Sequence, residues 1–242
     1  ENPHVDAIYG MHVLPDAHRA GQVGFHIGPI TTSVDLFDFT VSGRGGHGSR
    51  PDMSVNPVFC AASILTNTAT AWVNQITAGR TVTLGVTSIQ GGEAPNVIPD
   101  TADILGSLRF FNDEEGEKAV RIFKNVAEHT AAMNNCQVQF DDRFCVLCAP
   151  VINDEYYSNL ISTALPEVLP ENVTVSSCEP WYASESFSCY RRICPSVLAH
   201  LGINNPSYGS GAAHHNGFFD VDEGVLSTGV ISTLKFVAML QK

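Results

Sequence analysis

The order of the predicted secondary-structure elements between residues 34 and 145 constrains the fold of this chain more than any other feature. Alternating apolar and polar residues predict strands, and N-capping residues ahead of helix-forming runs predict helices. In chain order, the predicted elements are a strand over 35–41, a helix over 57–75, strands over 81–89 and 101–111, a helix over 113–135 and a strand over 137–144. This β-α-β-β-α-β order is typical of the split-βαβ, ferredoxin-like fold, in which both helices cover one face of an open sheet.

Local sequence supports the individual elements. Phe37, Phe39 and Val41 alternate with polar residues, as expected of a half-buried strand. Asn56 is a good N-cap and the proline after it suits the first position of a helix. Acidic residues follow Asn112, where the dipole of a helix favours negative charge.

The two flanks of this segment, residues 1–33 and 146–242, read as one divided domain. The first flank mixes short apolar runs with Gly and Pro, as strand ends and turns do. The second offers a helix from about Asp154, a strand over 172–176 and a long C-terminal helix from about Gly224. This order resembles the end of an α/β domain. We therefore predict an α/β domain, 1–33 and 146–242, with the ferredoxin-like domain 34–145 inserted into it.

Charge is scarce in this chain. Charged residues make up 16% of the sequence, against about 25% in a typical protein, and the formal net charge is −12. An acidic surface repels phosphate backbones, so we expect no nucleic-acid partner. No apolar run reaches the roughly 20 residues that cross a bilayer, so we expect no membrane partner. The low charge content suggests instead that part of the apolar surface is meant to be covered.

Both the cysteines and the N-terminus indicate the setting of the protein. The seven cysteines are odd in number and irregularly spaced, which favours reduced thiols in the cytoplasm over a disulfide framework. Cys145 and Cys148 form a C-x-x-C, but no second C-x-x-C lies at zinc-ribbon spacing, which favours two half-buried thiols. The chain begins ENPHVDAIYG, without an initiator Met or a recognisable signal peptide, and reads like the middle of a protein.

Histidines are the best local candidates for chemistry, because neutral imidazole binds divalent transition metals. His12 ends an apolar run, where a lone histidine is more often a hydrogen-bonded structural residue than a metal ligand. His214 and His215 precede a run of acids, a pattern that fits a metal ligand or a surface loop equally well. His47 stands between glycines on an exposed turn, where no packing reason requires a histidine.

Other candidates are weaker on local grounds. Asn96 fits simple turn chemistry, and Glu185 could cap a helix. Arg109 lies inside an apolar strand, where it either occupies an exposed sheet face or binds an anion. The sequence has no G-x-S-x-G, no P-loop and no G-x-G-x-x-G ahead of a helix, so serine hydrolase and nucleotide-binding functions have no support. No cysteine has the distinctive context of a nucleophile.

Five motifs, in the same order along the chain, resemble the family of metallopeptidases and amidohydrolases (peptidase family M20) that contains the aminoacylases, hippurate hydrolases and auxin-conjugate hydrolases. Residues 6–13 resemble its "DAIxGxHV", and residues 43–51 its "GKGGHGAxP". Residues 96–109 resemble "NVIPD…GTVR", 184–187 resemble "SEDF" and 215–223 resemble "HxPxFDxDE". Each motif is weak alone, but five in order make the resemblance specific.

The resemblance implies a zinc-peptidase-like α/β catalytic domain with an inserted ferredoxin-like lid that dimerises. It also implies hydrolysis of the amide bond of a small N-acyl amino acid or short peptide at a site with two divalent metal ions, Zn, Mn, Co or Ni. Two such ions share a water, lower its pKa and polarise the scissile carbonyl. A glutamate moves the proton, and a histidine of the lid stabilises the oxyanion.

Carried over position by position, the resemblance makes His12 a metal ligand. Counting back from the acidic run favours His215 over His214 as the C-terminal ligand, although a slip of one residue would reverse this choice. His47 matches the lid histidine that in family dimers reaches the active site of the partner.

The remaining matches concern the substrate. Asn96 and Arg109 match lid residues that hold it, with Arg109 suited to a carboxylate, and Glu185 matches a position that lines the pocket.

The departures from the family pattern are large. The upstream "CGHDxH" segment and Glu-Glu pair, which carry other metal ligands and the general base, do not occur in this sequence. Ser186 stands where Asp is usual, and residues 216–218 replace a proline-containing turn. We therefore expect the C-terminal part of a homodimeric amidohydrolase, inactive and with weak metal binding on its own. The alternative is a non-catalytic remnant that acts as a dimerisation or binding module.

Overall fold

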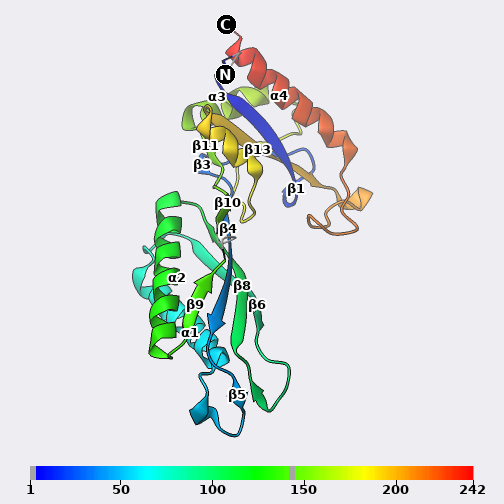
Figure 1. Ribbon diagram of the computed structural model, residues 1–242. Helices are drawn as coiled ribbons and strands as arrows, with labels where there is room; N and C mark the ends of the chain where they lie inside the picture. The colour runs from blue at the N-terminus through cyan, green and yellow to red at the C-terminus, as the bar shows by residue number, and fades with distance from the viewer. Residues whose placement is uncertain (1–3, 142–144, 242) are drawn as a thin grey trace. The chain divides into compact units, whose positions relative to one another are not determined.

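A computed structural model describes residues 4–141 and 145–241 (Figure 1). The chain divides into two compact units, Glu1–Thr31 with Val151–Lys242 and Thr32–Pro150. We call the first the α/β unit and the second the ferredoxin-like unit. The divisions lie within a few residues of the boundaries predicted for the inserted domain.

The ferredoxin-like unit has an antiparallel sheet with the strand order β10-β4-β8-β6, and β9 also pairs with β4. Its strands are β4 (Val34–Ser42), β6 (Val82–Gln90), β8 (Thr101–Phe110), β9 (Gln137–Phe140) and β10 (Cys145–Cys148). The predicted last strand runs past β9 into residues 142–144, which lie outside the described residues. The first and third strands of the motif, β4 and β8, are central, and β6 forms one edge.

Two helices cover one face of this sheet (Figure 1). Helix α1 (Pro57–Gln75) begins where the sequence predicts, and Asn56 Oδ1 accepts the N–H of Val58 at 2.9 Å. Helix α2 (Asp113–Met133) is capped in the same way by Asn112. The core between helices and sheet contains Phe37, Phe39, Val41, Cys60, Ile64, Ile104, Leu108 and Phe123. The ferredoxin-like prediction is therefore confirmed.

A small two-stranded sheet and a 3-10 turn form the glycine-rich tip of this unit. Strand β5 (Gly46–His47) pairs antiparallel with β7 (Val97–Ile98), and η1 (Pro51–Met53) follows β5. A Cβ at Gly43 would collide with the carbonyl oxygen of Val55, so only glycine lets the chain turn this closely.

The α/β unit is built on a mixed sheet with the order β1-β13-β2-β12. Its strands are β1 (Ile8–Arg19), β2 (Val23–Phe25), β12 (Val175–Ser177) and β13 (Ser196–Asn204). The β1–β13 and β12–β2 pairs are parallel, and β13–β2 is antiparallel. A separate antiparallel pair joins β3 (Gly28–Pro29) to β11 (Ile152–Asn153).

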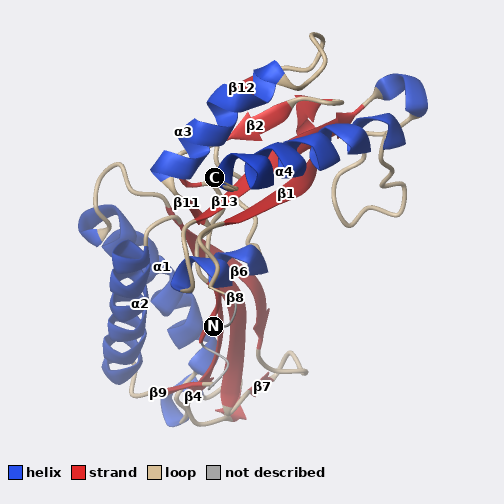
Figure 2. Ribbon diagram, turned by 90° about the horizontal axis from the view of Figure 1, so that it is seen from above, coloured by secondary structure: helices blue, strands red, loops and turns tan. Residues whose placement is uncertain are grey.

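Helices α3 (Glu155–Ala164) and α4 (Leu226–Leu240) pack on one face of the mixed sheet (Figure 2). Both lie near the predicted positions. The core there includes Val23, Phe25, Ile161, Leu165, Val197, Ala199, Leu201 and Phe236. Four 3-10 segments complete the unit: η2 (Leu165–Glu167), η3 (Ser186–Arg192), η4 (Pro206–Tyr208) and η5 (Glu223–Val225).

Strand β13 was not predicted, although it is central to the sheet. Every residue from Ser196 to Ile203 is buried, so the strand shows none of the alternation that marks a half-buried strand.

Helix α4 is apolar on two faces. Its inner face packs on the sheet, where the rings of Phe236 and Tyr9 stack at 5.0 Å. Its outer face exposes Leu226, Val230, Leu234 and Val237. Among the described residues, Glu223–Leu240 is the one window long and apolar enough to cross a membrane, with a mean hydropathy of 1.3. A packed core helix meets the same criterion, so this observation is weak support for a span.

Candidate functional site

Two imidazoles of the α/β unit converge on one backbone carbonyl. The ring of His12, on β1, lies 5.3 Å from the ring of His214. His12 Nδ1 and His214 Nε2 both contact the carbonyl oxygen of Val13, at 2.8 and 2.9 Å. A carbonyl only accepts hydrogen bonds, so both of these nitrogens carry a proton. In the neutral rings, His12 Nε2 and His214 Nδ1 therefore keep free lone pairs, the arrangement that fixes the tautomer of a metal-binding histidine.

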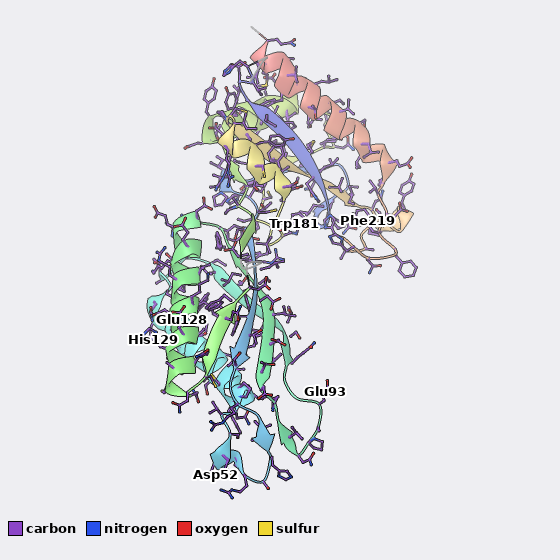
Figure 3. All side chains as sticks on the ribbon, viewed as in Figure 1. Asp52, Glu93, Glu128, His129, Trp181 and Phe219 are labelled. Atoms are coloured by element: carbon purple, nitrogen blue, oxygen red, sulfur yellow. The ribbon has the colours of Figure 1, made fainter. Side chains whose placement is uncertain are left out.

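Aromatic side chains surround this pair. The indole of Trp181 lies 4.9 Å from the His12 ring and 5.1 Å from the His214 ring. Phe219 stacks on His214 at 5.5 Å. Trp181 and Phe219 are labelled in Figure 3. Neither residue was predicted to belong to the site, although Trp181 lies three positions before the motif of residues 184–187 and Phe219 lies within the motif of residues 215–223.

The structure places the two neighbouring histidines, His214 and His215, in different surroundings. His214 is partly buried against His12, whereas His215 is exposed and has a positive φ of 64°. The reversal of the backbone at His215 places the two rings in different surroundings. This geometry favours His214 as the ring that acts with His12, while the sequence count favours His215.

A further histidine was not singled out in the sequence. His200, on β13, pairs in parallel register with His12 and is buried. Its Nδ1 lies 3.7 Å from the thiol of Cys178. Burial raises the pKa of Cys178 to about 11, so this thiol is protonated at neutral pH and does not form an activated Cys–His nucleophile.

Glu185 precedes η3 and acts as its N-cap. Its Oε1 accepts the N–H of Phe187 at 3.4 Å. The ring of Phe187 lies against β1, because a Cβ built on Gly10 would approach Phe187 Cε2 to 2.7 Å. Side chains alternate along a strand, so Gly10 and His12 share one face of the sheet. The segment that carries Glu185 therefore packs on the same face as His12.

The tip of the ferredoxin-like unit brings His47 and Asn96 together. Strand β5 places His47 opposite Val97, and the N–H of Gly48 donates to the carbonyl of Asn96 at 2.8 Å. His47 Nδ1 accepts the N–H of Ser49 at 3.2 Å and also contacts the hydroxyl of that residue. With Nδ1 accepting, the proton of the neutral ring lies on Nε2, which is then an exposed donor.

Arg109 lies far from the tip. It follows Thr101 by eight residues on β8, so at the usual rise per residue it lies about 26 Å from the start of that strand. Its side chain is partly exposed on the face of the sheet that the helices do not cover, and it forms no ion pair with a described residue. One copy of this unit therefore cannot bring Arg109 and His47 to the same small molecule.

Few side chains that could bind a metal ion lie close together in the described part of the chain. In residues 4–141 and 145–241, no group of three or more His, Cys, Asp and Glu side chains is arranged to hold a metal ion. Zinc usually takes four protein or water ligands, and the His12 and His214 pair supplies two. The described residues of this chain therefore do not form a complete metal site by themselves.

Comparison with known proteins identifies relatives of the whole chain. The sequence model of the peptidase dimerisation domain matches residues 21–134. The N-acetylcysteine deacetylase of Bacillus subtilis is 30% identical over 223 residues, 92% of this chain and 56% of the deacetylase. An IAA-amino acid hydrolase of Arabidopsis thaliana is 27% identical over 228 residues, 93% of this chain and 51% of that protein. The chain spans about half the length of these relatives.

Solved structures share the fold. A Staphylococcus aureus protein described as an aminohydrolase has a TM-score of 0.86 and 24% identity, covering 97% of this chain and 59% of that chain. A dinuclear metal-binding peptidase of the M20 family from Bacillus subtilis has a TM-score of 0.78 and 24% identity, covering 98% and 57%. The fold is thus that of a peptidase or amidohydrolase with an inserted dimerisation domain. The chain is a relative of the M20 peptidases and amidohydrolases, and the resemblance predicted from its motifs is confirmed.

Proposed function

We propose that this chain is the lid and C-terminal catalytic part of an amidohydrolase that cleaves small N-acyl amino acids or short peptides. The observation that carries the proposal is the pair of His12 and His214. Each ring donates one N–H to the carbonyl oxygen of Val13, which leaves a lone pair on the other nitrogen of each neutral ring. Relatives aligned over more than nine tenths of the chain are named as an N-acetylcysteine deacetylase and an IAA-amino acid hydrolase, which supports the substrate class.

The pair fits a metal ion only in part. His12 with His214, or with His215 as the sequence count favours, would contribute to holding divalent ions such as Zn, Mn, Co or Ni. When bound, such ions supply a nucleophilic hydroxide and polarise a carbonyl. A solved structure with this fold is described as dinuclear, which supports two ions per active site in the complete enzyme. Because the described residues form no complete set of ligands, we expect this chain alone to bind metal weakly.

We assign the lid residues to the substrate. His47 Nε2–H would donate to the oxyanion that develops at the scissile carbonyl. Asn96, beside it at the tip, would hold the same end of the substrate, and Arg109 would bind a carboxylate through its guanidinium. Glu185 would line the pocket from the α/β unit.

The separation of Arg109 from His47 supports a homodimer. One lid cannot place both groups on one small substrate, but two lids related by a two-fold axis can each contribute one of them. Strand β6 forms an edge of the sheet, so two copies could pair there and extend it. Size-exclusion chromatography with light scattering should show a dimer, and a folded monomer would contradict this assignment.

Fluorescence of Trp181 tests the metal assignment. In a Trp72→Phe background, Trp181 is the sole tryptophan and lies against both imidazoles, so bound Co²⁺ should quench it. His12→Ala should abolish the saturable quenching, and the same change at exposed His129 should not. Comparison of His214→Ala with His215→Ala then decides which of the two rings takes part. Unchanged Co²⁺ affinity in His12→Ala would refute the site.

Activity is tested with N-acetyl and N-benzoyl amino acids and dipeptides. The protein expressed from the whole open reading frame should hydrolyse at least one class, and this chain alone should not. Absence of hydrolysis by the whole protein would contradict the proposed function. Activity of the chain alone, comparable to that of the whole protein, would contradict the claim that other segments complete its site.

A second function, a non-catalytic dimerisation or binding module, has one observation in its favour. The described residues contain no cluster of three metal-binding side chains. In-frame coding sequence for "CGHDxH" and a Glu-Glu pair upstream favours the enzyme, whereas a start codon immediately before Glu1 favours the module.

We also propose a cytoplasmic location. The cysteines whose side chains the structure describes are free thiols, as expected in a reducing compartment. Fractionation of cells that express a tagged protein tests this location.

A further inference from the structure

An elongated groove on the α/β unit lies along the outer side of α3. It has a volume of about 830 Å³ and is lined by α3, by the last residue of η2 and by one residue near the end of α4. The side chains around it are Asp154, Glu155, Tyr156, Asn159, Leu160, Thr163, Ala164, Glu167 and Met239. None of the proposed catalytic or substrate-binding residues belongs to it.

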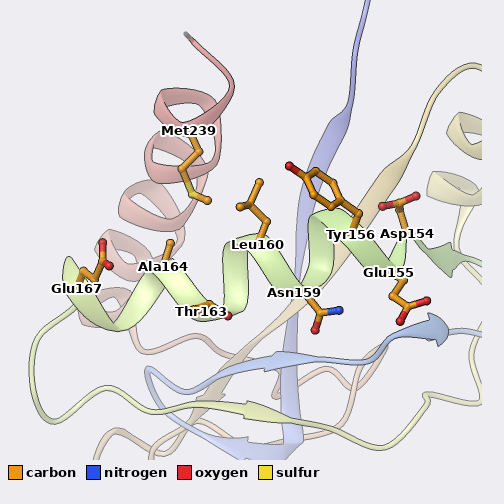
Figure 4. A pocket seen from close by; sticks show the side chains of 9 residues that line it. All are labelled: Asp154, Glu155, Tyr156, Asn159, Leu160, Thr163, Ala164, Glu167 and Met239. Carbon is orange, nitrogen blue, oxygen red and sulfur yellow. The ribbon is translucent and has the colours of Figure 1, made fainter.

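The middle of the groove is apolar. Tyr156, Leu160 and Ala164 recur every four residues and so form one stripe along α3. In Figure 4, Tyr156 and Leu160 rise from the same side of the helix, and Met239 reaches down from α4 towards them. Tyr156 is 66% exposed, although an aromatic side chain gains most from burial. Tyrosine and methionine are both enriched where proteins bind other proteins.

The ends of the groove are acidic. Glu167 lies at one end, and Asp154 and Glu155 lie at the other (Figure 4). Lys235 pairs with Glu167 at 2.9 Å, but the glutamate side chain is still 70% exposed. The described residues that line the groove include no Lys or Arg, and the chain as a whole carries a net charge of −12. The carboxylates that line the groove therefore favour cations, more strongly at the end of Asp154 and Glu155 than at Glu167, where Lys235 offsets part of the negative charge.

We propose that this groove docks an amphipathic helix of a partner polypeptide, apolar in its middle and basic at both ends. The distance along α3 from Asp154 to Glu167 is about 20 Å at the rise of a helix, which a partner helix of about 14 residues matches. Apolar side chains of the partner at i, i+4 and i+7 would contact Tyr156, Leu160 and Met239, as in other complexes where a helix lies in a groove. Its terminal Lys or Arg residues would face the carboxylates. This docking is independent of the amide hydrolysis proposed above.

The test uses the full chain and two synthetic fluorescent peptides of 14 residues built from Leu and Lys. One peptide has Leu on a single helical face and Lys at both ends, and the other has the same composition in scrambled order. Anisotropy should give a micromolar dissociation constant for the first peptide and one at least about tenfold weaker for the second. Equal binding of the two peptides would mean attraction by charge alone and would overturn the proposal.

Variants of the chain locate the site. Leu160→Lys should weaken binding of the first peptide at least about tenfold, and Glu155→Gln and Glu167→Gln about two- to fivefold each, in keeping with exposed ion pairs. Leu234→Lys is the matched control, because Leu234 is 62% exposed on α4 and does not line the groove. If Leu160→Lys does not fold by circular dichroism, Tyr156→Lys takes its place, since that side chain is mostly exposed.

Two other results would also overturn the proposal. Peptide affinity that Leu160→Lys and Tyr156→Lys leave unchanged would place binding elsewhere. A change in oligomeric state on Leu160→Lys, seen by light scattering, would mean that a second copy of this chain covers the groove.

Discussion

Replacement of Asp35 by asparagine should make the stability of the ferredoxin-like unit less dependent on pH. Asp35 lies on β4, opposite Leu108, and its side chain is 2% exposed. Its Oδ1 has no hydrogen-bond partner in the part of the chain that the structure describes. Burial, with a smaller contribution from the carboxylate of Asp113, raises the pKa of Asp35 from 3.8 to about 6. The neutral carboxylic acid is therefore the form that the folded state prefers.

The sign of the effect follows from this upward shift. An acid with a higher pKa in the folded state contributes stability that is fully present below pH 3.8 and is lost as the pH rises through about 6. The shift of about two units corresponds to a loss of about 3 kcal/mol above pH 7. About 1.4 kcal/mol of this loss falls between pH 5 and pH 8. Asparagine is neutral at every pH, so the variant lacks this loss.

The measurement is urea unfolding at pH 5 and pH 8, followed by Trp72 in a Trp181→Phe background. Trp72 packs against the core of the ferredoxin-like unit, so it reports that unit alone. The free energy of unfolding of Asp35→Asn, relative to the parent, should increase by about 1.4 kcal/mol from pH 5 to pH 8. The same change at exposed Asp103 is the control. A difference that stays constant with pH, or decreases, would refute the reasoning.

Four other substitutions, one of them a control at an exposed site, test the packing. Asn56→Ala removes the cap of α1 and should lower the free energy of unfolding by about 1 kcal/mol in urea. Phe123→Ala, at a fully buried site between helix and sheet, should lower the free energy of unfolding by about 3–5 kcal/mol. Phe59→Ala, at a site that is 73% exposed, is the control and should lower it by less than about 0.5 kcal/mol in the same measurement. Gly10→Ala should displace the ring of Phe187 and speed hydrogen exchange of η3, and unchanged exchange would show that the ring adjusts without moving the segment.

Much of the ferredoxin-like unit could be predicted because its signals are local. Asn56 and Asn112 cap helices through contacts two or three residues away. The alternation of Phe37, Phe39 and Val41 requires only that one face of β4 be buried, and that face is indeed the one in the core. Each signal lies within a few residues of the element it defines.

The candidate site could be predicted only in part. The motifs singled out His12, His47, Asn96, Arg109 and Glu185, but sequence spacing does not measure distance in space. The structure shows His47 beside Asn96 at the tip, in the segment ahead of β8, and well separated from Arg109, which lies near the far end of β8. This separation, not visible in the motif order, is the observation on which the proposed homodimer rests.

By itself, the sequence determined the class of fold, the starts of the main helices and the relationship to M20 hydrolases, since caps, alternation and ordered motifs are all properties of neighbouring residues. Only the tertiary structure decided that β13 lies at the centre of the sheet, because a strand buried on both faces has no periodic pattern to read. Only the tertiary structure, too, placed His214 against His12, since that contact joins residues about two hundred positions apart and depends on the backbone reversal at His215.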